Sequence, residues 1–457
     1  MIDFERVDKP NFKYSVLHPY INFFHEYIFY SKYYVLNRER IPRKKPVVVI
    51  SNHQNGLSDA LGILFAFRKD GRYPVFIARS DIFKKDFVAK LLRLLRIMPA
   101  YRARDASSGS GSVRENSAIF SKSARILSDN GVVCLFPEAG HEDCHHLGSF
   151  KKGFARIAFS AAEEMNFEKP VYILPCSNHY SHYFGFQHKL IITVGEPFSF
   201  EELYDLYREH PDRARKVLTE WAHERIQGLM LNIKDKALYE EYDILRTLYA
   251  RNVVKREGQK AWYYPNILKA EQKIVASVDR LRDDNPEDFN ALMLKAREYS
   301  VTLDKLHVYD WVLAEKISFG TVVFRTLLAL LLIPLLIYGC ITNFIPYNAS
   351  TLITRKIKDP MLHNSFHFGI SCLISYPIWF IATFITVWHI TGVWWIALCY
   401  LGSVPVSLVV YIRGKIMVKK QLMRFTRFGF WWRGDFLYHK AKSIRAQIVA
   451  ILDRIVK

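Results

Sequence analysis

The chain has 457 residues, half of them hydrophobic, and a formal net charge of +20. This length exceeds what a single hydrophobic core usually serves, so we expect two or three structural units. The charge gives the surface a broad positive potential, which favours anionic partners, namely lipid headgroups, phosphorylated substrates or nucleic acid.

The six cysteines indicate reduced packing residues. They lack the paired spacing of a zinc site, and three of them lie in apolar segments. The first residues, Met1 to Arg6, show no basic region followed by an apolar stretch. We therefore expect no secretory signal, and a catalytic side that faces the cytoplasm.

The N-terminal segment suits a membrane surface. Residues 14–43 mix Tyr, Phe and His with basic residues, a composition typical of the headgroup layer. We predict an interfacial amphipathic segment over residues 1–45. The alternative is an ordinary amphipathic helix packed on a soluble core.

Residues 46–230 alternate short β-rich runs with helical patterns, which predicts an α/β sandwich. The Ser- and Gly-rich run 105–112 is expected to be a loop that can order around a ligand. The predicted strands are 46–51, 74–78, 132–136, 171–175 and 190–194, and the helical patterns include 60–68, 87–96, 113–128 and 154–165.

A histidine and a carboxylate follow the first predicted strand. His53 lies just beyond the strand end, and Asp59 lies where the next helical pattern begins. A neutral imidazole can take a proton from a hydroxyl, while a carboxylate fixes its tautomer and stabilises the imidazolium. The pair therefore predicts activation of an alcohol. The same residues are also typical of a turn, with Asp59 as a helix cap.

A second group of residues suits a phosphate. Glu138 and Gly140 follow the strand 132–136, and Lys151 lies in the basic segment that comes next. Basic side chains and exposed backbone amides after a strand can hold a phosphate, and Arg102 can bind one in a bidentate manner. Judged singly, each basic residue is also an ordinary solvated charge.

Four sequence blocks, taken in order, resemble the lysophospholipid and glycerol-3-phosphate acyltransferase superfamily. The resemblance covers residues 46–198, roughly a third of the chain, and the joint order is more specific than any one block. The blocks are Asn52 to Asp59, Met98 to Arg102, Phe136 to Gly140 and Ile173 to Pro175.

The resemblance implies roles for the candidate residues. It implies that His53 is the general base through which a glycerol hydroxyl attacks an acyl thioester, and that Asp59 is its partner. It also implies that Arg102, Glu138 and Gly140 bind the glycerol phosphate. The donor would be acyl-CoA or acyl-carrier protein, and the acceptor a glycerol phosphate or lysophospholipid.

The sequence departs from the family pattern in two places. Five residues lie between His53 and Asp59 where the family usually has four, so either the start of the helix bulges or the roles shift. After Glu138, the usual Gly, Ser or Thr and basic residue are replaced by Ala139, Gly140 and His141, which leaves acceptor specificity open. The nearby histidines are read as polar surface, because acyl transfer from a thioester needs no metal or other cofactor.

The C-terminal half predicts helices and membrane segments. Residues 231–316 read as a helical spacer with a break at 283–286. The 46 residues from His367 to Ile412 contain no charged side chain, and one crossing needs about 20 apolar residues. We predict a transmembrane hairpin of residues 367–390 and 392–412, a re-entrant or spanning segment over 317–347 around Pro334, and a basic aromatic helix over 413–457.

Together these features predict a membrane-bound acyltransferase of phospholipid synthesis that acts on glycerol-3-phosphate or 1-acylglycerol-3-phosphate. Two alternatives remain open at this point, a non-catalytic membrane scaffold that binds anionic lipids and an acyltransferase for a different lipid acceptor. Nucleic-acid binding is suggested by charge alone, without a recognisable module, and we do not expect it.

Overall fold

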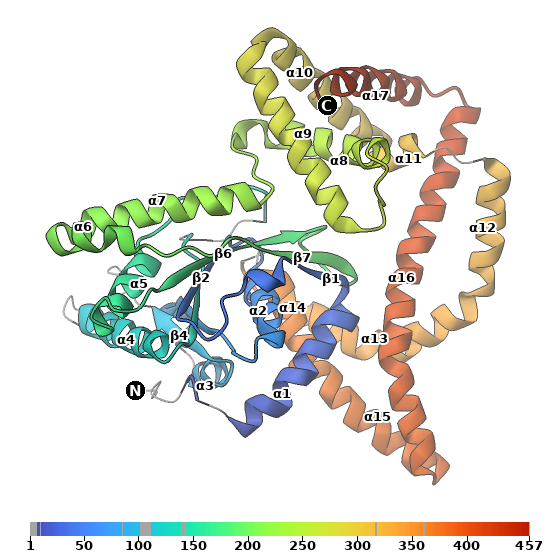
Figure 1. Ribbon diagram of the computed structural model, residues 1–457. Coiled ribbons are helices and arrows are strands. Elements are labelled where there is room, and N and C mark those ends of the chain that lie inside the picture. The colour runs from blue at the N-terminus through green and yellow to red at the C-terminus, as the bar shows by residue number, and fades with distance from the viewer. Residues whose placement is uncertain are drawn as a thin grey trace. The chain divides into compact units, whose positions relative to one another are not determined.

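The computed structural model describes residues 7–9, 11–84, 86–100, 111–138, 140, 143–315, 318–359 and 362–456. The chain divides into two compact units (Figure 1). Unit 1 contains Met1–Met230 and Ile357–Phe368, and unit 2 contains Leu231–Lys356 and Gly369–Lys457. Unit 1 therefore includes a short segment that is distant in sequence.

Unit 1 is built on a seven-stranded sheet in the order β1-β7-β6-β2-β5-β3-β4. Strands β6 and β7 pair antiparallel, and the other neighbours pair parallel. Strand β2 lies inside the sheet and is buried along its whole length, as expected for a parallel strand covered on both faces. The strands are β1 (Tyr30–Leu36), β2 (Val47–Ser51), β3 (Val75–Arg79), β4 (Ile97–Ala100), β5 (Val132–Leu135), β6 (Tyr172–Tyr180) and β7 (His188–Val194).

The predicted α/β class is confirmed, and each of the five predicted strands is present. Strand β6 continues to Tyr180, five residues beyond its predicted end. Strands β1 and β4 were not predicted. Strand β1 lies at the sheet edge, and its Lys32 stays exposed, so its composition resembles that of an interfacial segment.

Helices cover both faces of the sheet. Helices α4, α5 and α7 share one buried cluster with alternate residues of the strands, and α2 packs on β6 and β7. The helices of unit 1 are α1 (Phe12–Phe23), the π-helix η1 (Phe24–Phe29), α2 (Leu57–Ala66), α3 (Asp86–Leu94), α4 (Gly111–Ser128), α5 (Gly153–Glu164), α6 (Tyr204–Glu209), α7 (Pro211–Leu229) and the start of α14 (His363–Ile370).

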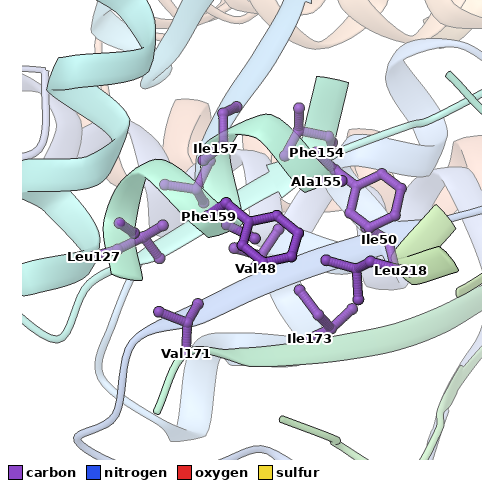
Figure 2. Close-up of a cluster of buried hydrophobic side chains, with 14 of the residues drawn as sticks. Val48, Ile50, Leu127, Phe154, Ala155, Ile157, Phe159, Val171, Ile173 and Leu218 are labelled. Carbon is purple, nitrogen blue, oxygen red and sulfur yellow. The ribbon is translucent and has the colours of Figure 1, made fainter. Parts of the chain in front are cut away.

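A buried hydrophobic cluster lies between the sheet and α5 (Figure 2). Val48 and Ile50 of β2 point into it together with Ile173 of β6, and Phe154 and Phe159 of α5 fill the space above them. Side chains alternate between the faces of a strand, which is why every second residue of β2 contributes. The core fixes the strand ends that carry the candidate site.

We predict that Ile173→Ala lowers the free energy of unfolding by about 2–5 kcal/mol, because a fully buried side chain leaves a cavity. Ile82 is 44% exposed, so Ile82→Ala is a matched control with a much smaller expected effect. Guanidinium unfolding of the detergent-solubilised protein measures both. Equal losses in the two variants would show that this cluster is not the stabilising core.

Unit 2 begins with a bundle of polar helices. Helix α9 ends at Asp284 and α10 begins at Pro286, so the predicted break at 283–286 is confirmed. Arg246 and Glu271, both buried, form an ion pair of 2.9 Å between α8 and α9. The bundle consists of α8 (Tyr239–Arg256), α9 (Tyr264–Asp284), α10 (Pro286–Leu306), α11 (Asp310–Ala314) and α17 (Phe436–Ile455).

By length and composition, two helices of the described chain can cross a membrane, His363–Thr391 and Trp394–Trp432. The turn between them contains Gly392, whose φ of +66° favours glycine. Helices α12 (Phe319–Leu331) and α13 (Ile333–Thr354) form a pair bent by 51°. Pro334 lies in the first turn of α13, so the bend falls where the sequence indicates.

A buried polar cluster joins three apolar helices of unit 2. Asn343 of α13 donates to Ser407 Oγ of α16 (Trp394–Trp432) over 2.9 Å and accepts from Tyr376 of α15 (Tyr376–Thr391) over 3.2 Å. Gly339 lies so close to α16 that an added Cβ would be 2.7 Å from the Ser407 carbonyl oxygen. Small residues and interhelical hydrogen bonds of this kind hold helices together in lipid.

Candidate active site

The candidate site is centred on His53, at the carboxyl end of β2, and Asp59, in the first turn of α2. The distance between His53 Nδ1 and Asp59 Oδ2 is 2.8 Å. The Asp59 side chain is fully buried, whereas the His53 side chain is 20% exposed. The imidazole can therefore be reached from outside while its partner carboxylate is shielded from water.

The turn before α2 wraps around this carboxylate. Asp59 Oδ2 also accepts hydrogen bonds from the backbone N–H groups of Gln54, at 2.9 Å, and Asn55, at 2.7 Å. Gly56 follows with φ +50° and ψ −121°, a conformation that glycine adopts most readily. The extra residue of the motif is thus accommodated in a bulged start of α2, and Asp59 still reaches the ring.

Tyr180 completes the environment of Asp59. Its hydroxyl donates to Asp59 Oδ1 over 2.6 Å. Burial, followed by the nearby Asp59 charge, raises the pKa of Tyr180 well above its usual value, so the hydroxyl remains a donor. Our sequence reasoning missed Tyr180, because it lies on the part of β6 that continues past the end of β2.

Glu138 supports the backbone on the other side of His53. Its Oε1 accepts from the His53 N–H at 2.7 Å, and its Oε2 accepts from the Gly148 N–H at 2.8 Å. Burial raises the pKa of this carboxyl, while those two N–H groups act in the opposite direction. The ring of Phe136 stacks on His53, with 4.4 Å between ring centroids. Substrate binding by Glu138 stays a prediction.

A groove of about 390 Å³ lies beside this region and carries positive charge. Lys151 lines it together with Lys152 and Arg156. Its apolar wall includes Leu135, which immediately precedes the Phe136 that stacks on His53. The groove therefore combines cationic and apolar surface, and it begins one residue before the ring that stacks on His53.

The remaining predicted residues are less defined. Gly140 is exposed, and an added Cβ would meet no atom within 4 Å. Arg102 lies outside the described residues, although Ala100, two positions earlier, lines the groove. Within the described ranges, no group of three His, Cys, Asp or Glu side chains could hold a metal ion.

Two comparisons of the sequence with known proteins found matches. Residues 32–179 match the family model described as Acyltransferase. A probable 1-acyl-sn-glycerol-3-phosphate acyltransferase of Mycoplasma pneumoniae is 28% identical over 137 residues, which are 30% of this chain and 47% of that protein. The chain thus matches about half the length of this curated relative.

A comparison with solved structures also found a similar chain. The crystal structure of the 1-acyl-sn-glycerophosphate (LPA) acyltransferase PlsC from Thermotoga maritima aligns with 50% of this chain and 84% of that chain, at 19% identity and a TM-score of 0.31. On the sequence matches, residues 32–179 are similar to the Acyltransferase family, which supports the superfamily resemblance found in the sequence.

We predict that Tyr180→Phe destabilises the protein by about 1–3 kcal/mol, because a buried carboxylate loses a hydrogen-bond donor. Tyr14→Phe is the matched control, since the buried Tyr14 hydroxyl has no hydrogen-bond partner among the described residues. Guanidinium unfolding compares the two variants. A Tyr180→Phe protein as stable as Tyr14→Phe would contradict the assigned hydrogen bond.

Proposed function

We propose that this chain is a membrane-bound O-acyltransferase that moves a fatty acyl group from an acyl thioester to the hydroxyl of a glycerol phosphate lipid precursor. The observation that carries the proposal is the His53–Asp59 pair, with 2.8 Å between Nδ1 and Oδ2. A partly exposed imidazole backed by a buried, hydrogen-bonded carboxylate is the arrangement that general-base catalysis requires.

The reaction follows from this geometry. Asp59 binds the Nδ1 side of the His53 ring, so Nε2 is the atom that accepts the proton of the acceptor hydroxyl. The resulting alkoxide oxygen attacks the thioester carbonyl carbon and gives a tetrahedral intermediate. That intermediate expels the thiolate, which takes the proton from the imidazolium. No covalent enzyme intermediate is needed, because the thioester is already activated.

The basic groove offers a place for the acceptor phosphate. Lys151, Lys152 and Arg156 line it, and cationic side chains bind phosphate through charge-assisted hydrogen bonds. We propose Lys151 as a phosphate ligand, with Arg102 and Gly140 as further contacts. The name of the Mycoplasma relative favours 1-acylglycerol-3-phosphate as the acceptor over glycerol-3-phosphate.

We propose that the catalytic unit works at the cytoplasmic membrane surface. Helix α1 and the adjoining η1 expose a row of apolar side chains at Phe12, Val16, Phe23 and Tyr27. Basic residues precede the apolar hairpin at 355–358 and follow it from 413 onward, and such flanks remain on the cytoplasmic side. At the membrane surface, the acyl tail of a substrate can stay in the apolar layer while its anionic headgroup stays in water.

An acyl-transfer assay on isolated membranes tests the activity. Acyl-CoA or acyl-carrier protein is the donor, and glycerol-3-phosphate, dihydroxyacetone phosphate and 1-acylglycerol-3-phosphate are offered separately. We expect transfer to 1-acylglycerol-3-phosphate. Membranes that bind anionic lipid yet acylate none of the three acceptors would favour the scaffold alternative and refute the proposal.

We predict that His53→Ala lowers the transfer rate by roughly 10²–10⁴-fold, the usual contribution of a positioned base, while the protein stays folded and membrane-bound. His210 is exposed in the same unit, so His210→Ala should keep the wild-type rate. Initial rates and membrane fractionation measure both variants. Full activity in His53→Ala would show that another group removes the proton.

A further inference from the structure

Two polar side chains from a distant part of the sequence lie against the turn between His53 and Asp59. Asn364 and Ser365 belong to the first turn of α14 and are only 3% and 5% exposed. Both lie in unit 1 with the candidate site. They fall outside residues 32–179, the part that matches the acyltransferase family.

Ser365 caps helix α2. Its Oγ accepts from the Leu57 N–H at 2.9 Å and donates to the Asn55 carbonyl oxygen at 3.2 Å. The first N–H groups of a helix have no partner within the helix and usually find one in the preceding residue. That residue is Gly56, which has no side chain to offer. The cap is instead supplied from 308 positions along the chain.

The contact with Ser365 also explains why residue 56 is a glycine. A Cβ added to Gly56 would lie 2.7 Å from Ser365 Oγ. The turn and the serine hydroxyl therefore approach each other more closely than any larger residue permits, and the φ of +50° also favours glycine.

Asn364 links the same turn to a second loop. Its Nδ2 donates to Asn55 Oδ1 at 3.1 Å, and its Oδ1 accepts from the Gly185 N–H at 3.0 Å. Asn55 Nδ2 in turn donates to the Tyr183 carbonyl oxygen at 2.8 Å. Asn55 is thus held from both sides, and its own N–H is one of the donors to Asp59.

The segment that presents these side chains is itself anchored. The ring of Phe368, one turn further along α14, lies 5.0 Å from that of Phe29 and 5.8 Å from that of Phe24. His363 Nε2 lies 2.9 Å from the Ile357 carbonyl oxygen. Asn364 and Ser365 therefore project from a fixed turn.

We infer that Asn364 and Ser365 are positioning residues, which hold the bulged turn so that Asp59 meets His53 at hydrogen-bonding distance. This inference rests on the proposed function. The helix that begins at His363 is one of the two that can cross a membrane. The turn that carries the catalytic pair is therefore held by the first turn of a helix that is able to cross a membrane.

The test compares Ser365→Ala, Ser365→Thr and Ser371→Ala in the full-length protein. Ser371 is buried on the same continuous helix, and its hydroxyl has no hydrogen-bond partner among the described residues. With oleoyl-CoA and 1-oleoylglycerol-3-phosphate, we expect Ser365→Ala to lower kcat about 10-fold without a change in either KM, because small misplacements of a reacting group are costly. Ser365→Thr keeps the hydroxyl and should restore most of the rate, and Ser371→Ala should equal wild type.

Hydrogen exchange gives a readout that does not depend on activity. Ser365→Ala should speed exchange of the amides in residues 54–59 and leave those of β2 unchanged, whereas Ser371→Ala should change neither. The positioning role would be overturned if Ser365→Ala exchanged these amides at the wild-type rate, or if Ser365→Ala and Ser371→Ala lost kcat equally. If wild-type protein acylates no acceptor, the proposed function fails, and exchange alone decides on the positioning role.

Discussion

The active region is organised around one buried negative charge. Asp59 has no exposed side-chain surface, and a carboxylate in such a place is unstable unless hydrogen-bond donors surround it. Two backbone N–H groups of the turn, the Tyr180 hydroxyl and the His53 ring meet this requirement. Because these donors come from the end of β2, the turn and β6, satisfying the charge on α2 also fixes the position of the imidazole.

The sheet topology explains why these elements converge. Strand β2 lies between β5 and β6 and runs parallel to both, so the three strands deliver their carboxyl ends to one edge of the sheet. Ligands of open α/β sheets usually bind at such an edge. Phe136 and Glu138 come from the end of β5, and Tyr180 from the extended end of β6. Lys151, which lines the basic groove, belongs to the segment that follows Glu138 in the chain.

The apolar helices of unit 2 are subject to a different constraint if they lie in a membrane, as their length and composition permit. Lipid offers no hydrophobic driving force between helices, so close packing and buried polar contacts must hold them together. Asn343, Ser407 and Tyr376 supply such contacts within unit 2. In unit 1, the start of one of these helices caps α2 through Ser365. A helix that is long and apolar enough to cross a membrane thus begins at the candidate site.

The sequence by itself determined the α/β class, the positions of five strands, the charge-free hairpin region and the pairing of His53 with Asp59, because periodicity, composition and motif order are local properties. It did not reveal β1, whose edge position permits an interfacial composition. Only the tertiary structure decided how the extra residue before Asp59 is accommodated, and that Tyr180 and Ser365 act on this motif. Those contacts join residues that are 121 and 308 positions apart, and no local pattern encodes an approach that depends on how the sheet and helices pack.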